Sequence, residues 1–170
     1  MERFTGSIRT ALRANDWYGA LTTALTLPDI CGRMETPTEG SNKRYARWFS
    51  EWVEPVYTME VGGQRHTFLS GNDCYALRCS LLHEGGENIE EQRAREALDD
   101  FHFIMPPPNG SCFHKIQSGQ SLLLQVDIFC NDVADAVDRW AASDKAKEIE
   151  VEQRMQGLLQ IRDVSNGIQF

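Results

Sequence analysis

The spacing of apolar residues predicts that the chain is mainly helical. Apolar positions recur at helical spacing from about Thr5 to Leu27, and this first helix is expected to end there because Pro28 disfavours helical backbone in the residue before it. Residues 33–40 are expected to form a loop, and Ser41 is expected to cap a second helix. Large aromatic residues that should anchor the core are Trp48, Phe49, Trp52, Phe129 and Trp140. A helical bundle follows from this pattern.

The middle of the chain combines turn signals with a well-delimited third helix. Gly62 and Gly63 separate two short β-prone pieces and predict a small hairpin. Ser70 with Asp73 three residues later predicts a helix start of the capping-box type. The glycine pair at residues 85 and 86 predicts the end of that helix.

After this helix the period of the apolar pattern changes. Residues 88–99 have an acidic, helical composition, whereas residues 101–105, 112–116 and 121–126 alternate and predict short strands. We therefore expect a small β-meander, over about residues 100–126, inserted into the bundle. A fourth helix is expected to begin near Asp127 or Asn131, and a fifth at Ser143, with a thin apolar seam that includes Ile149 and Leu159.

Length and composition favour a single domain over residues 1–170. The apolar content of 41% and charged content of 25% are ordinary for a globular protein. The five cysteines are scattered and form no Cys-x-x-Cys pair, as in reduced cytosolic proteins. Apolar runs are too short to cross a bilayer and the first residues lack a signal-peptide core, so we expect a cytoplasmic protein without a membrane partner. No motif requires a cofactor.

Arg78 and His83 on the third helix are the main candidates for chemistry. An arginine stays cationic and can bind phosphate oxygens in a bidentate manner, and a histidine exchanges a proton near neutral pH. Together they could cleave an RNA phosphodiester without a metal, with His83 as base or acid and Arg78 stabilising the charge that develops.

This pair resembles the R-x4-6-H motif of HEPN domains, with four residues between Arg78 and His83. The resemblance covers only the third helix, with a compatible helical layout around it. It implies a HEPN-like helical bundle that forms a homodimer, so that two motifs line one cleft. It also implies metal-independent ribonuclease activity, or RNA binding alone, in a bacterial defence or stress system.

Other charged residues could support this site. The basic residues Lys43, Arg44 and Arg47 lie on the second helix and would be the best patch for contacting an RNA backbone. Either Asp29 or Asp73 could orient Arg78 or His83 in the folded bundle, although for Asp73 capping of its own helix is the favoured interpretation.

An alternative function is a catalytically silent module that binds a protein partner, such as an antitoxin-like or scaffolding subunit. The net charge of −8 favours it, because an acidic surface repels phosphate. Cys79 also favours it, because active HEPN members usually have a polar residue directly after the arginine.

Other groups of reactive side chains are explained more simply by packing. Ser80 or Cys79 could form a nucleophile–base pair with His83, but no orienting acid is evident. The histidines and cysteines of the expected meander region lack the spacing of a zinc site, so no metal is expected, though two of them could line a small-ligand site. These residues are His102, Cys112, His114 and Cys130.

Overall fold

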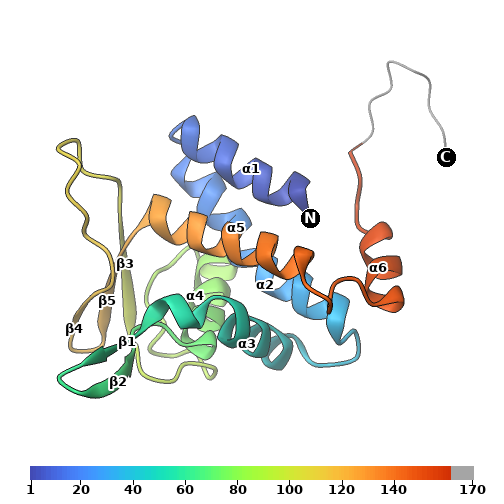
Figure 1. Ribbon diagram of the computed structural model, residues 1–170. Helices are drawn as coiled ribbons and strands as arrows, with labels where there is room; N and C mark the ends of the chain where they lie inside the picture. Colours follow the sequence, from blue (N-terminus) through green and yellow to red (C-terminus); the bar gives the residue numbers. More distant parts are fainter. Residues whose placement is uncertain (162–170) are drawn as a thin grey trace.

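The computed structural model describes residues 1–161 and is mainly α-helical, with two small sheets at one end (Figure 1). The helices are α1 (Glu2–Arg13), α2 (Trp17–Glu35), α3 (Ser41–Trp52), α4 (Gly71–Glu84), α5 (Val126–Ala142), α6 (Ile149–Gln156) and the short 3-10 helix η1 (Glu54–Tyr57). Helix α2 packs against each of the five other α-helices and forms the centre of the bundle. No helix within residues 1–161 is long and apolar enough to cross a membrane.

The expected first helix is two helices, which corrects the sequence-based prediction. Asn15 has a φ of +57°, and the side chain of Asp16 accepts a hydrogen bond from the Gly19 amide at 3.0 Å to start α2. Pro28 does not end this helix but lies buried inside it. A proline inside a helix costs about 3 kcal/mol. Here Leu27 and Cys31 are fully buried on either side of it, and burial of such side chains offsets that cost.

The aromatic core is confirmed. Trp48, Phe49, Phe129 and Trp140 are fully buried, and the rings of Trp48 and Trp140 meet edge to face at 6.2 Å. Ser41, however, does not cap α3. Gly40 occupies the cap position without a side-chain bond, and the Ser41 hydroxyl instead donates to Asp29 of α2.

The hairpin and the third expected helix are also confirmed. Strands β1 (Thr58–Val61) and β2 (Gln64–Thr67) pair antiparallel across Gly62 and Gly63, which both have positive φ. The Ser70 hydroxyl accepts the Asp73 amide at 3.1 Å to cap α4. Gly85 ends the helix with a φ of +70°.

The second sheet is not a meander. Its strands β3 (Asp100–Ile104), β4 (Ile116–Ser118) and β5 (Ser121–Gln125) lie in the order β3-β5-β4, with β5 parallel to β3 and antiparallel to β4. The expected strand over residues 112–116 is wrong except at its last residue. A three-residue strand followed by a turn at Gly119 leaves β5 free to pair with β3 on its other edge.

Two helical predictions near the sheet and the C-terminus are wrong. Residues 88–99 form turns instead of a helix, because the buried carboxylate of Asp73 binds the amides of residues 96–98 and Ile89 and Leu98 are buried. The last helix begins at Ile149, not at Ser143. The expected apolar seam comprises Ile149, Met155, Leu158 and Leu159. Met155 and Leu158 pack against the core, Ile149 and Leu159 are exposed, and Val151 is the buried residue of the helix.

Candidate functional site

Asp29 of α2 connects three helices at the base of the candidate site. Its carboxylate accepts two 3.1 Å hydrogen bonds from the Ser41 hydroxyl and one of 2.6 Å from Arg44 Nε, both on α3. Arg78 Nη2 of α4 lies 3.9 Å from its other oxygen. The structure therefore places Asp29 beside Arg78, and we refer to Asp29, Ser41, Arg44 and Arg78 as the Asp29 cluster.

Arg78 is incompletely satisfied within this cluster. Its Nε is buried and has no hydrogen-bond partner among residues 1–161, and its Nη1 faces the weak acceptor Cys79 Sγ at 3.9 Å. The ring of Tyr75 lies 5.9 Å from the guanidinium carbon. Because Arg44 already holds Asp29 at the shorter distance, the cluster sets two cations against one carboxylate. Its charge and its free donors suit an anion.

The surface beside Arg78 is partly open. The Arg78 side chain is 20% exposed, and Tyr75 and Cys79 on the same side of α4 are half-buried. Burial raises the pKa of Tyr75, and its contact with Cys79 raises it further, so the phenol stays protonated and can donate a hydrogen bond. An anion that reached Arg78 would therefore meet a neutral hydroxyl next to the guanidinium.

His83 lies near the end of α4 and is exposed, without a hydrogen bond or ion pair to any described residue. Five residues correspond to about 140° of rotation and about 7.5 Å along a helix. Accordingly, no direct contact joins His83 to Arg78 within the described chain. One copy of the protein presents the two groups separately, on neighbouring faces of one helix.

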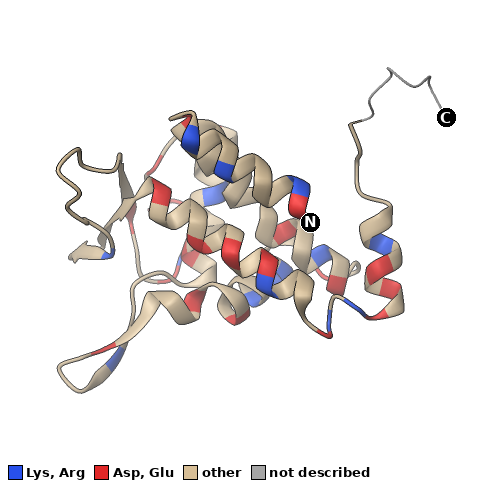
Figure 2. Cartoon of the chain, turned by 45° about the horizontal axis from the view of Figure 1, so that its top comes forward, with Lys and Arg blue, Asp and Glu red and all other residues tan. Residues whose placement is uncertain are grey.

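The basic residues of α3 do not form a free patch. Arg47 is held by Glu35 at 2.6 Å, by Glu39 at 3.1 Å and by the Thr36 hydroxyl at 2.7 Å. Arg44 is committed to Asp29, so Lys43 is the exposed cation of the predicted trio. Figure 2 shows the same mixing of basic and acidic positions along the helices.

Asp73 serves the loop after α4 instead of Arg78. Its buried carboxylate accepts the Ser70 hydroxyl at 2.9 Å and backbone amides at 2.6 Å from Glu96 and 3.1 Å from Ala97. Ser80 is likewise engaged in this loop, donating to the Asn88 carbonyl at 2.8 Å. These contacts fix the loop against α4 and give Ser80 a structural partner other than His83.

The histidines of the sheet region lie apart. His102 pairs opposite Leu123 and approaches the carboxylates of Glu87 at 3.6 Å and Asp100 at 3.4 Å, whereas His114 lies against α5. Within residues 1–161, no three side chains of His, Cys, Asp or Glu come together as a metal site would require. His102 on β3 and His114 beside α5 have different partners and form no common site.

A polar cluster that the sequence did not reveal surrounds His114. Tyr57 donates a 3.0 Å hydrogen bond to Asp132, whose carboxylate lies 3.7 Å from His114 Nε2. His114 Nδ1 accepts the Gln125 amide at 3.2 Å, so this nitrogen carries no proton. Burial and, to a smaller extent, nearby Lys115 together lower the pKa of His114 to about 4, so the ring is neutral at pH 7. The cluster joins η1, α5 and the loop before β4, which no local sequence pattern connects.

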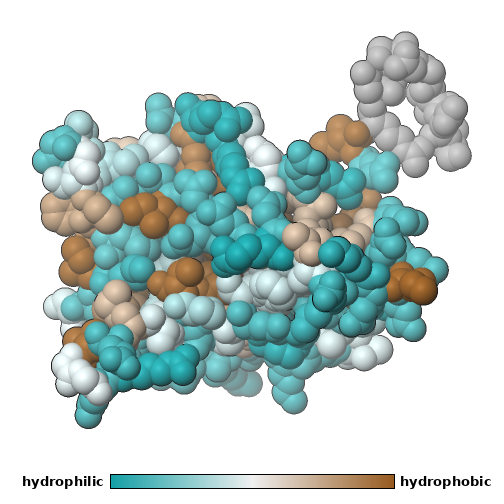
Figure 3. All heavy atoms as spheres, viewed as in Figure 1, coloured by the Kyte–Doolittle hydropathy of each residue, from teal (hydrophilic) through white to brown (hydrophobic). Residues whose placement is uncertain are grey.

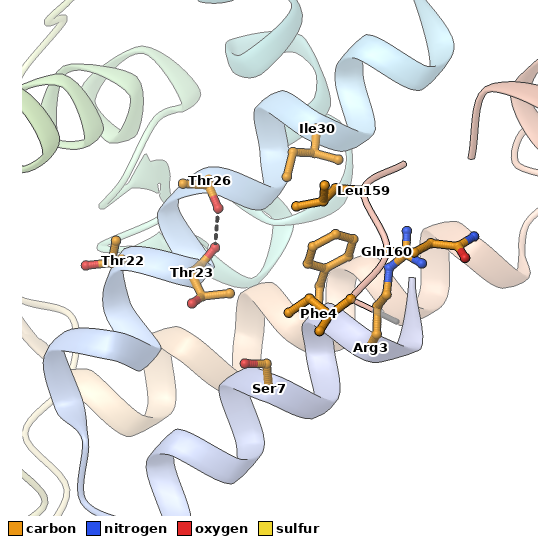
Figure 4. A pocket seen from close by; sticks show the side chains of 10 residues that line it. Arg3, Phe4, Ser7, Thr22, Thr23, Thr26, Ile30, Leu159 and Gln160 are labelled. Carbon is orange, nitrogen blue, oxygen red and sulfur yellow. Dashed lines mark hydrogen bonds between the residues drawn. The ribbon is translucent and has the colours of Figure 1, made fainter. Parts of the chain in front are cut away.

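An apolar groove of about 580 Å³ lies between α1, α2 and residues 159–161 (Figure 4). Phe4 and Ile30 form apolar walls, and Arg3 lies over the Phe4 ring at 5.1 Å. The Thr26 hydroxyl donates to the Thr23 carbonyl at 2.8 Å and is thereby engaged with its own helix. This groove could hold an apolar group, but it contains no pair of groups for acid–base chemistry.

No family model, curated protein or solved structure matches the chain. The case for a function therefore rests on the site itself.

Proposed function

We propose that the protein binds and cleaves RNA without a metal, with Arg78 holding the scissile phosphate and His83 transferring a proton. The observation that carries this proposal is the guanidinium of Arg78, which is 20% exposed and lies 3.9 Å from its nearest carboxylate, Asp29, while Arg44 holds the same carboxylate at 2.6 Å. A cation held in place with free donors is suited to a phosphate. The resemblance to HEPN domains at Arg78 and His83 adds to it.

The reaction is attack by a ribose 2′-oxygen on the adjacent phosphorus. The new O2′–P bond forms as the P–O5′ bond breaks, giving a 2′,3′-cyclic phosphate and a free 5′-hydroxyl. A base removes the 2′ proton and an acid supplies the proton that the leaving oxygen takes up. Arg78 stabilises the additional negative charge on the phosphoryl oxygens in the transition state.

Two copies of the chain complete the site in this proposal. A single His83 supplies one proton-transfer group, and the reaction needs both a base and an acid. Arg78 and His83 lie about 140° apart around α4, without a hydrogen bond or ion pair between them within residues 1–161. A homodimer that places two α4 helices side by side brings a second His83 to the same phosphate.

The alternative is a catalytically silent protein that binds a protein partner. It is supported by the net charge of −8 and by the pairing of Arg44 and Arg47 with carboxylates, which leaves few cations for an RNA backbone. The apolar groove beside Phe4 offers such a partner a surface. In this alternative, Arg78 contributes only to the packing of α4 against α2.

Cleavage of an RNA oligonucleotide labelled at its 5′ end, in EDTA, separates the two functions. We expect products that end in a 2′,3′-cyclic phosphate, and none from an oligonucleotide with 2′-deoxyribose at the cleaved position. His83→Ala is expected to lower the rate at least about 100-fold. The matched control is His102→Ala, which removes another exposed imidazole with carboxylate neighbours and should leave the rate unchanged.

Absence of cleavage and of RNA binding by the folded wild-type protein would contradict the proposal and favour the partner-binding alternative. Equal activity in His83→Ala and the wild type would remove His83 from the mechanism. Circular dichroism of both variants shows whether each remains folded.

A further inference from the structure

Strand β3 forms one edge of its sheet, and only the first part of that edge is covered. Its inner side pairs with β5. On the outer side, the Phe101 amide donates to the Glu87 carbonyl at 3.1 Å, and the Ile89 amide donates to the Asp99 carbonyl at 2.7 Å. Backbone groups of alternate strand residues point to the same side, so the N–H and C=O of Phe103 also point outward. No backbone partner within residues 1–161 meets them.

The space beside this free edge is a groove and not packed core. It has a volume of about 790 Å³ and runs between residues 103–108 and the turn from α1 to α2, where Asn15 and Trp17 form the opposite wall. The Met105 side chain is 65% exposed at its rim. A neighbouring strand needs a separation of about 4.8 Å from β3, and a groove of this size accommodates a short extended segment.

The segment that covers Phe101 does not extend along the rest of the edge. Residues 85 and 86, which precede Glu87, belong to the end of α4, where their amides donate to the carbonyls of Leu81 and Ser80. The chain therefore leaves the sheet at Glu87.

Charge at the covered end favours a basic occupant. Glu87 and Asp100 both lie within 3.6 Å of His102, and Oδ1 of Asp100 is buried without a hydrogen-bond partner in residues 1–161. These two carboxylates have only one imidazole between them, and the whole chain carries a charge of −8. A lysine or arginine near the end of an incoming segment would be attracted to this position.

The end of the molecule that carries the sheets also exposes several large apolar side chains. Figure 3 shows apolar patches gathered over the sheet side of this face. Large apolar side chains exposed in this region are Val56, Met59, Val61, Met105, Phe113 and Ile116. Of these side chains, Met105 lines the groove beside the free edge of β3.

We infer that the free edge of β3 binds an extended basic peptide segment of a partner protein, which adds a strand to the sheet. The backbone of the peptide pairs with Phe103 and Met105. Its apolar side chains enter the groove between Trp17 and Met105, and a basic side chain meets Asp100. Strand addition takes its affinity from backbone hydrogen bonds and its specificity from alternate side chains. This partner site goes beyond the proposed RNA cleavage and does not depend on it.

The probe for this site is a short synthetic peptide of alternating valine and lysine, added to the 15N-labelled full chain and followed by NMR. We expect the amide signals of Phe103 and Met105 to shift, and calorimetry to give a measurable affinity. Two control peptides of the same sequence are N-methylated, one at the odd residues and the other at the even residues. Both retain their charge and side chains, but each has lost the amide hydrogens along one of its edges. For the peptide whose methylated edge faces β3, we expect about tenfold weaker binding for each hydrogen bond lost.

Two variants at the exposed Met105 distinguish the contribution of its backbone amide to peptide binding from that of its side chain. Met105→Pro removes the amide hydrogen at this position, which a sheet edge tolerates, whereas Met105→Ala keeps it. We expect Met105→Pro to weaken peptide binding about tenfold relative to Met105→Ala, with the two variants unfolding at similar temperatures.

Three outcomes would overturn the inference. Unmoved signals of Phe103 and Met105 at millimolar peptide would mean that the edge is not a binding site. Equal binding of the unmodified peptide and both N-methylated peptides would exclude strand addition. Self-association of the chain that Met105→Pro abolishes, with no response to the peptide, would assign the edge to a second copy instead.

Discussion

Two polar clusters of the molecule are built around one carboxylate each and differ in charge and exposure. At Asp132, Tyr57 donates a hydrogen bond and the nearby His114 is a neutral ring that is only 3% exposed. At Asp29, two arginines share one carboxylate, and the Arg78 side chain is 20% exposed. Each cluster keeps one buried nitrogen without a hydrogen-bond partner in residues 1–161, His114 Nε2 in the first and Arg78 Nε in the second. Only the second combines permanent positive charge with a side chain that a ligand can reach.

The comparison teaches that residue type does not separate structural from functional groups. His114 and His83 are both histidines that the sequence marks as candidates. The first is buried, bonded to a backbone amide and has a pKa of about 4, whereas the second is exposed and has no described partner. Exposure and charge, and not the presence of a histidine or an arginine, distinguish the two sites.

The largest effect on stability is expected from His114→Ala. The substitution leaves a cavity and removes the acceptor of the Gln125 amide. Together these changes should cost about 3 kcal/mol of unfolding free energy. Urea denaturation measures it, with the half-exposed His102→Ala as the control expected within about 0.5 kcal/mol of the wild type. A loss below 1 kcal/mol would contradict a structural role of the buried ring.

His114 should also make the stability of the protein depend on pH. Below its ordinary pKa of 6.5, the unfolded chain binds a proton on His114 that the folded chain, with a pKa of about 4, does not bind. Stability is therefore expected to fall by about 2 kcal/mol between pH 7 and pH 5. Burial also raises the pKa of Asp132, and this shift acts in the opposite direction only at the acidic end of the range.

Urea titrations at several pH values, for the wild type and His114→Gln, test this dependence. The glutamine keeps a polar side chain that does not titrate, so the difference between the two slopes isolates the proton on His114. Parallel curves for the two proteins would show that His114 titrates normally in the folded state.

Tyr57→Phe sharpens the comparison by removing one hydroxyl. The 3.0 Å hydrogen bond to Asp132 is lost, while the buried ring stays. We expect a loss of about 1.5 kcal/mol, in the range of a hydrogen bond to a charged acceptor. The unfolding midpoint in urea measures it, and RNA cleavage per folded molecule should not change. A loss of cleavage at constant stability would link the Asp132 cluster to function.

The smallest effect on stability is expected from Arg47→Ala on α3. Arg47 is about one-third exposed, and its pairs with Glu35 and Glu39 are partly screened by solvent, so the loss should stay within about 1 kcal/mol. RNA binding, measured by fluorescence anisotropy at fixed salt, should remain within about twofold of the wild type. Weakening of RNA binding tenfold or more would show that Arg47 exchanges its carboxylates for phosphate.

Local signals explain which parts of the fold could be predicted. The capping pair Ser70 and Asp73, the turn at Gly62 and the final Gly85 each act within a few residues, and the structure confirms the elements that they delimit. Predictions failed where distant contacts decide the structure. The carboxylate of Asp73 reaches a segment more than twenty residues away and binds its amides, so a helical composition there gives turns.

The sequence predicts which residues form the candidate site, but not which of them are paired with carboxylates. Helical spacing and the motif indicate Arg78 and His83 as one helix pair. Whether an arginine is free depends on which carboxylates fold beside it, and this separates Arg47, with two partners, from Arg78, which shares one. Asp29 is among the predicted partners of Arg78, but its contacts with Ser41 and Arg44 are not predicted, because the approach of α2 to α3 is a product of helix packing.

The arginine Nε–H signals of the folded protein test the central claim most directly. An RNA oligonucleotide with 2′-deoxyribose at the cleaved position binds without reacting, and its addition can be followed by 15N NMR. The account predicts that the Arg78 Nε–H signal shifts on binding while those of Arg44 and Arg47, which already donate to carboxylates, stay in place. An unmoved Arg78 signal on saturation with the oligonucleotide would contradict the account.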